Sequence, residues 1–202
     1  YDEIKALCEK LGIMEDIKEF KARALNPEHP HQMGTAQNPD IYFQTREAVN
    51  SYYTALPEIV ENYMNEINKI TGRNYGLFNY YGAPDAENII IAMGSACETI
   101  QTVAEKLNAE GKKVGLLAVH LYRPFPTKSF LKALPESVKT VSVLDRTKES
   151  GSIGEPLYLD VVATLTQAFA NGEIKAMPRI VGGRYGLSSK EFTPGMVKAV
   201  YD

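Results

Sequence analysis

The spacing of apolar residues changes along the chain, and the change divides it into two unlike parts. In the first part, residues 1–75, apolar side chains recur every three or four positions, as expected for amphipathic helices. The segments with this spacing are 4–11, 17–24 and 49–70. Gly12 and Gly72 follow two of these segments and are predicted to end the helices. Pro57 lies within the longest segment, which predicts either a kinked helix or a new helix start near that proline.

From about residue 86 the apolar residues form short continuous runs instead. The runs cover 88–93, 113–119, 140–144 and 179–183. Amphipathic segments separate them, at 95–109, 127–134 and 153–170. Continuous apolar strands that alternate with helices favour a mainly parallel sheet with helices on both faces. Residues 76–202 are therefore predicted to form one α/β domain, and residues 1–75 a helical and loop segment before it.

Composition and charge narrow the classes of function. The 202-residue chain has a net charge of −3 and a sequence pI of about 5.7, which does not favour a nucleic-acid-binding surface. Its longest strongly apolar run, 89–93, is far too short to span a membrane. The two cysteines, Cys8 and Cys97, lack zinc-site spacing and are expected to be reduced thiols in a cytoplasmic protein. Because the chain does not begin with Met, it is expected to be a piece of a longer protein.

A proline-rich loop at 26–40 contains a pair of closely spaced histidines. His29 and His31 flank Pro30, but no nearby Cys or Asp supplies further metal ligands at a suitable spacing. The sequence therefore predicts no metal site in this loop.

The turn after the run 88–93 is where an α/β protein could hold a phosphate. Ser95 and Glu98 form an S-x-x-E capping box at the start of the next helix, and residues 152–155 form a second one. A capping box occupies the amide donors that an anion would use, and the turn lacks both the G-x-G-x-x-G and the G-x-x-x-x-G-K-[ST] patterns. We therefore favour a plain helix start over a ligand-binding turn. Cys97 is expected to be a small buried residue rather than a reactive thiol.

The carboxyl ends of the predicted parallel strands bring a group of polar residues to one edge of the sheet. The residues expected at this edge are His120, Arg123, Asp145, Arg146 and Arg184. They could form a contact face for another domain or an anion-binding face, or Asp145 could pair with an arginine and stabilise the loops. A hydrolase triad of Ser95, His120 and Asp145 is not favoured, because the serine lacks a G-x-S-x-G elbow and the chain order differs from that of such hydrolases. We assign no catalytic, cofactor-binding or metal-binding residue.

Five long strings resemble one known family. They are NPEHPHQMGTAQNPDIYFQTREAVNSYY, TGRNYGLFNYYGAPDAENIIIAMGSACETI, GLLAVHLYRPFP, VSVLDRTKESGSIGEPLYLDV and GGRYGLSSKEFTPGMVKAVY. Together they cover nearly the whole chain and resemble pyruvate:ferredoxin (flavodoxin) oxidoreductase. Met33 is a departure, because an arginine is expected at that position, and an ionic contact from this loop is therefore in doubt.

This resemblance implies an internal part of a much longer enzyme. Residues 1–75 are similar to the end of its pyrimidine-binding domain, and 76–202 to a transketolase C-terminal-like domain with a mostly parallel five-stranded open sheet. The implied reaction converts pyruvate and coenzyme A to acetyl-CoA and CO2 and passes electrons to ferredoxin or flavodoxin. The implied cofactors are thiamine diphosphate, Mg2+ and [4Fe-4S] clusters, and the implied assembly is a homodimer. The residues that bind these cofactors are all expected elsewhere in the enzyme.

Three hypotheses about the function therefore remain open at this point. The first is an internal structural or interface domain of the oxidoreductase, inactive by itself. The alternative is a free-standing α/β module that binds an anion or a nucleotide, and an independent hydrolase is a weaker third reading.

Overall fold

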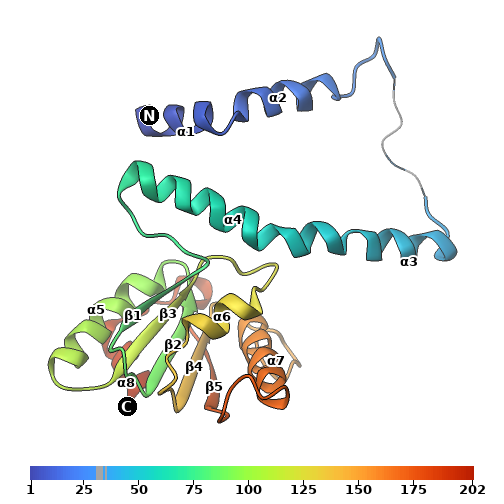
Figure 1. The fold of residues 1–202 in the computed structure, drawn as a ribbon. Coiled ribbons are helices and arrows are strands. Elements are labelled where there is room, and N and C mark those ends of the chain that lie inside the picture. The colour runs from blue at the N-terminus through green and yellow to red at the C-terminus, as the bar shows by residue number, and fades with distance from the viewer. Residues whose placement is uncertain (31–33, 35) are drawn as a thin grey trace. The chain divides into compact units, whose positions relative to one another are not determined.

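The computed structural model describes residues 1–30, 34 and 36–202 and contains two compact units, Tyr1–Tyr75 and Gly76–Asp202 (Figure 1). Two positions named above, His31 and Met33, lie outside the described residues.

The first unit consists of helices and loops. Its helices are α1 (Asp2–Lys10), α2 (Ile13–Ala22), α3 (Pro39–Ala48) and α4 (Asn50–Thr71). Gly12 and Gly72 end the predicted helices, each with a φ of 67°, a left-handed conformation that favours glycine. Helix α4 begins at Asn50 and continues through Pro57, so the prediction of a new helix start at the proline is wrong.

Apolar side chains of the first unit stay exposed. None of the residues in α1 to α4 is buried. The aromatic side chains of Phe43 and Tyr52 are 67% and 76% exposed. An ion pair between Lys10 of α1 and Glu66 of α4 links two of the helices. In the described part of the chain, no helix combines the length and the apolar character that a bilayer span requires.

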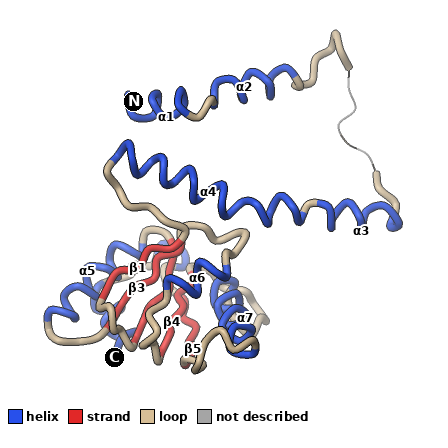
Figure 2. The backbone as a smooth tube through the Cα atoms, viewed as in Figure 1, coloured by secondary structure: helices blue, strands red, loops and turns tan. Residues whose placement is uncertain are grey.

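The second unit is built on a five-stranded sheet (Figure 2). The strands are β1 (Phe78–Gly82), β2 (Asn88–Met93), β3 (Val114–Val119), β4 (Thr140–Asp145) and β5 (Arg179–Arg184). Their order is β1-β3-β2-β4-β5, with β1 antiparallel to β3 and the other three pairs parallel. The prediction of a mostly parallel five-stranded sheet is confirmed.

Helices cover both faces of this sheet. They are α5 (Ala96–Ala109), α6 (Thr127–Ala133), α7 (Pro156–Ala170) and α8 (Pro194–Tyr201). On one face, Ile90, Leu116 and Val197 belong to the apolar core that includes α5 and α8. On the other face, Phe130 and Leu157 belong to the core that includes α6 and α7. This two-sided cover explains why the central strands read as continuous apolar runs.

Gly115 of β3 contacts side chains of both the neighbouring strand β1 and the last helix, α8. The Tyr80 ring of β1 lies against Gly115 so closely that a Cβ atom there would collide with it. The Tyr201 hydroxyl of α8 donates a hydrogen bond to the Gly115 carbonyl (2.9 Å). A residue other than glycine at this position would therefore disturb both contacts.

Candidate functional site

The strand order reverses between β2 and β4. Helix α5, which follows β2, packs on one face of the sheet, whereas α7, which follows β4, packs on the other. In open α/β sheets this reversal opens a crevice beyond the carboxyl ends of the two strands, where ligands commonly bind. The loops that border the crevice begin at Gly94 after β2 and at Arg146 after β4.

All five residues predicted for the carboxyl edge follow or end the parallel strands there. Asp145 and Arg184 are the last residues of β4 and β5 and are paired in the strand register. Arg146 follows β4, whereas His120 and Arg123 lie in the loop after β3. Each of the five residues makes different hydrogen bonds or ion pairs, so they do not form a single charged cluster.

Asp145 caps helix α7. Its Oδ1 accepts a hydrogen bond from the Leu157 amide (3.0 Å) and its Oδ2 accepts one from the Tyr158 amide (3.1 Å). The carboxylate thus satisfies two first-turn donors that a helix cannot satisfy internally. The side chain is 2% exposed, and burial raises the pKa of this carboxyl despite the two amide donors. The expectation that Asp145 pairs with an arginine is therefore wrong among the described residues, because two amides use its oxygens.

Two of the predicted arginines pair with carboxylates at α7. Arg184 pairs with Glu155, which also accepts a hydrogen bond from the Glu149 amide (2.6 Å). Burial raises the pKa of Glu155, but these two donors outweigh it and hold the pKa below its usual range. Arg123 pairs with Asp160. Both cations are therefore neutralised within the unit and fasten loops to α7.

Two further contacts hold the loop after β3. The Arg123 guanidinium lies over the Tyr122 ring, 4.0 Å from its centroid, which is a cation–π arrangement. His120 Nδ1 lies 2.8 Å from the Gly76 carbonyl. His120 thus contacts the start of the unit, which precedes β1.

Arg146 borders the crevice itself. Its Nε donates to the Gly186 carbonyl (3.1 Å), and the side chain is exposed. Two adjoining hollows share Ser95, Arg146 and Tyr185. The larger, about 410 Å³, is also lined by Tyr122 from the loop after β3 and by residues that end or follow β2 and β4. The smaller, about 210 Å³, extends to Thr99, Gly186, Lys190 and Phe192.

The two capping boxes predicted from sequence are wrong. Ser95 has helical dihedral angles (φ −63°, ψ −20°), whereas a capping residue needs an extended backbone, and no side chain caps α5 in the described chain. Ser152 donates instead to the Gly154 carbonyl (2.7 Å), and the last residue before α7 is Glu155. In the described chain, capping side chains therefore do not occupy the amide donors at the β2 turn, contrary to the prediction.

Cys97 is half-buried in the first turn of α5. Burial, with a smaller contribution from the charge of Glu98, raises the pKa of its thiol to about 11. Because the thiolate is the reactive species, this thiol is poorly suited to nucleophilic chemistry near neutral pH.

Sequence reasoning missed Tyr185 and Lys190 at the crevice. Both lie in the irregular segment between β5 and α8, where no periodic pattern indicates which way a side chain points. The only usable signal was that this segment, too, follows the carboxyl end of a parallel strand.

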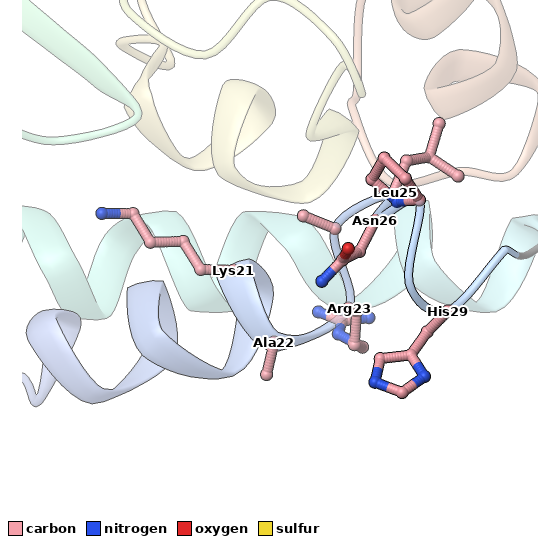
Figure 3. Close-up of a pocket in the computed structure, with 8 residues that line it drawn as sticks. Lys21, Ala22, Arg23, Leu25, Asn26 and His29 are labelled. Atoms are coloured by element: carbon pink, nitrogen blue, oxygen red, sulfur yellow. The ribbon is translucent and has the colours of Figure 1, made fainter.

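A separate hollow of about 710 Å³ lies in the first unit, after α2 (Figure 3). Lys21, Arg23 and His29 are among its lining residues, and in Figure 3 the Lys21 side chain extends away from His29. All its lining residues are exposed. Within the described ranges, no group of three or more His, Cys, Asp or Glu side chains could hold a metal ion. The lining residues of this hollow therefore offer no such metal-binding group.

Comparison with protein families matches residues 86–188 to the family model described as "Pyruvate:ferredoxin oxidoreductase core domain II". Among curated proteins, the pyruvate:ferredoxin oxidoreductase of Moorella thermoacetica is 58% identical over 193 residues, or 96% of this chain and 16% of that protein. The pyruvate-flavodoxin oxidoreductase of Enterobacter agglomerans is 58% identical over 186 residues, or 92% of this chain and 15% of that protein. The chain thus spans about one sixth of the length of these relatives.

Among solved structures, one match is a 2-oxoglutarate:ferredoxin oxidoreductase from Magnetococcus marinus, determined with 2-oxoglutarate, coenzyme A and succinyl-CoA bound. It is 21% identical to this chain, with a TM-score of 0.39, and the match covers 71% of this chain and 23% of that one.

Proposed function

The chain belongs to the pyruvate:ferredoxin oxidoreductase core domain II family, and from this we propose that it serves as an internal domain of an enzyme that oxidatively decarboxylates pyruvate. The observation that carries the proposal is the combination of high identity and low coverage. The match to the Moorella enzyme includes 96% of this chain but only 16% of the enzyme. The free-standing binding module is not favoured, because the relatives are several times longer.

The proposed reaction of the whole enzyme converts pyruvate and coenzyme A to acetyl-CoA and CO2 and passes two electrons to ferredoxin or flavodoxin. We propose that thiamine diphosphate, Mg2+ and the [4Fe-4S] clusters are held by other parts of the enzyme. The residues of this chain do not fit a cluster, since a [4Fe-4S] cluster needs four thiolates and the chain has two cysteines, Cys8 and Cys97. No chemical step is therefore assigned to this chain.

We further propose that residues 1–75 are the end of the pyrimidine-binding domain and that 76–202 form the domain that follows it. Exposed apolar side chains on α3 and α4 support the first part, since such stripes are normally covered by a neighbour. We propose the carboxyl edge of the sheet as a contact face with the remaining enzyme. Its charged loops suit the polar contacts common between domains. Ile153, 94% exposed in the β4–α7 loop, adds an apolar side chain that a neighbouring domain would bury.

The experiment that tests the assignment compares the 202-residue chain with the full-length gene product that contains it. Both are assayed with pyruvate, coenzyme A, thiamine diphosphate and a viologen dye. We expect dye reduction by the full-length enzyme and none by the chain alone. Pyruvate-dependent turnover by the chain alone, or none by an intact, cofactor-loaded enzyme, would contradict the assignment.

Amide hydrogen exchange tests the contact face. We expect residues 147–154 to exchange at least tenfold more slowly in the full-length enzyme than in the 202-residue chain, because a neighbouring domain would cover them. The exposed α5–β3 turn at residues 110–112 is the internal control. Equal exchange of 147–154 in the two proteins would rule out the contact face while leaving the family assignment intact.

A further inference from the structure

The crevice at the β2–β4 reversal contains cations that the unit itself does not neutralise. Arg123 pairs with Asp160 of α7, and Arg184 pairs with Glu155, the residue before α7. Arg146, by contrast, bonds a carbonyl through Nε, and in the described chain neither its terminal nitrogens nor the Lys190 ammonium forms an ion pair. Both side chains line the smaller hollow, so this hollow has an unbalanced positive charge.

The beginning of α5 adds further donors to the same hollow. Ser95 and Ala96 line it, and their amides precede the first intrahelical hydrogen bond of this 14-residue helix. The Ser95 hydroxyl is not used as a cap, as shown above. The helix dipole favours negative charge at this end. An anion in the smaller hollow would therefore meet two cations, a free hydroxyl and the positive end of a helix.

The larger hollow suits an organic group. It is lined mostly by apolar atoms, including those of Met93, Tyr122 and Pro156. The Tyr122 hydroxyl is buried and lies near the Asp160 carboxylate, so the ring is the part of Tyr122 that an organic group would meet.

From this arrangement we propose that the crevice binds a small organic molecule through a phosphate group. The phosphate lies in the smaller hollow, between Arg146, Lys190 and the start of α5, and the organic part lies in the larger hollow against Tyr122 and Pro156. The opposite orientation is disfavoured, because the Asp145 carboxylate lines the larger hollow and would repel the phosphate. This site is additional to the proposed place of the chain within the oxidoreductase and does not rest on it.

The test is a titration of the 202-residue chain, with nitrogen-15 amide NMR as the readout and inorganic phosphate, pyrophosphate and phenyl phosphate as probes. We expect saturable shifts at residues 94–99, 146–147 and 185–190. Arg146→Gln and Lys190→Gln should each weaken binding by about tenfold, the loss expected for one charge-assisted hydrogen bond. Phenyl phosphate should bind more tightly than inorganic phosphate, because only its ring reaches the larger hollow.

Matched controls lie at the other edge of the sheet. Arg179→Gln at the start of β5 and Lys112→Gln before β3 remove the same charges at the amino ends of the strands and should leave the affinity unchanged. Equal weakening by the controls, or shifts that do not saturate by about 50 mM, would overturn the proposal. Equal affinity for phenyl phosphate and inorganic phosphate would overturn the part that concerns the larger hollow. Failure in this titration would leave the dye-reduction assay of the full-length enzyme unaffected, so the two proposals fail separately.

Discussion

The two units have similar amphipathic helices but differ in what covers the apolar sides. In the first unit none of the residues in α1 to α4 is buried. In the second unit, α5 and α7 each bury several apolar side chains against the sheet, among them Ile100 and Leu157 with 0% exposure. An amphipathic pattern therefore indicates which face of a helix needs cover, but burial depends on whether the chain provides a partner.

The difference also appears in the kind of interaction that holds each unit. The first unit relies on local helix contacts and surface ion pairs such as those of Glu66 with Lys10 and Lys69. These two lysines, Lys10 foremost, lower the pKa of Glu66 to about 2. Exposed ion pairs contribute little to stability, whereas apolar burial contributes most. We therefore expect the second unit to set the stability of the chain.

Removing a core ring from the second unit should have the largest effect. Phe130 of α6 is fully buried, so Phe130→Ala should lower the free energy of unfolding by about 3–5 kcal/mol. Phe43→Ala is the matched change in the first unit and should cost less than about 1 kcal/mol, because this ring is 67% exposed. Urea denaturation followed by far-UV circular dichroism measures both. Equal losses would show that the first unit has a core of its own, contrary to the structure.

Loss of the remote cap on α7 should have the next largest effect. Asp145→Ala removes the acceptors for the Leu157 and Tyr158 amides and should cost about 1–2 kcal/mol. Asp145→Asn keeps one acceptor oxygen and should cost less. Asp40→Ala, in the exposed first turn of α3, is the control and should change stability by less than about 0.5 kcal/mol. A loss well above 3 kcal/mol for Asp145→Ala would instead indicate a broken buried ion pair.

A pH-dependent effect is expected at Tyr80. Its hydroxyl donates to the Ala83 carbonyl (2.5 Å), so Tyr80→Phe should cost about 1 kcal/mol at pH 7. Burial, helped by the charge of Asp85, raises the pKa of Tyr80 to about 12, whereas an unfolded tyrosine titrates near pH 10. Between these values the folded state binds more protons, so the wild-type protein loses stability as pH rises. The deficit of Tyr80→Phe should therefore shrink above about pH 10.

Denaturation curves at pH 7, 9, 10 and 11 measure this convergence. Tyr52→Phe on α4 is the control from the first unit, where the ring is 76% exposed, and it should not change stability at pH 7. A constant difference between wild type and Tyr80→Phe across the whole range would show that the Tyr80 hydroxyl does not contribute to the alkaline loss.

The smallest effect is expected from backbone strain. Ser188 has a φ of 50° and a ψ of 42°, a left-handed conformation that disfavours residues other than glycine. Ser188→Gly should therefore raise stability, by at most about 1 kcal/mol. Gly72→Ala is the opposite change, at the left-handed end of α4, and should reduce helix content. If Ser188→Gly is destabilising, contacts of the serine side chain must outweigh the strain.

Much of the fold could be predicted from the continuous apolar runs. The run 88–93 coincides with β2, and the other three runs match β3, β4 and β5 to within one residue at each end. Strand β1 was missed because FNYYG mixes polar and aromatic residues at a half-buried edge of the sheet. Helix α8 was missed because it is short and follows an irregular segment.

The polar contacts were harder to predict, for two physical reasons. The S-x-x-E pattern is local, but the left-handed turn at Gly94 (φ 74°) leads the chain into helical geometry already at Ser95, so the serine cannot cap. Bonding of Asp145, Arg123 and Arg184 depends instead on how α7 is rotated against the sheet. The parallel topology places residues at the carboxyl edge, but only the three-dimensional packing decides which charges are paired.

The contact of α8 with β3 has a consequence for synthesis of the protein on the ribosome. The chain emerges from its amino terminus, so all five strands are made before Val197 and Tyr201. Until these two residues emerge, the core beside Ile90 and Leu116 has an open side and the Gly115 carbonyl lacks its tyrosine donor. The segment that matches the family model, 86–188, ends before both residues. A nascent chain that has completed this segment must therefore wait for the last helix before its core can close.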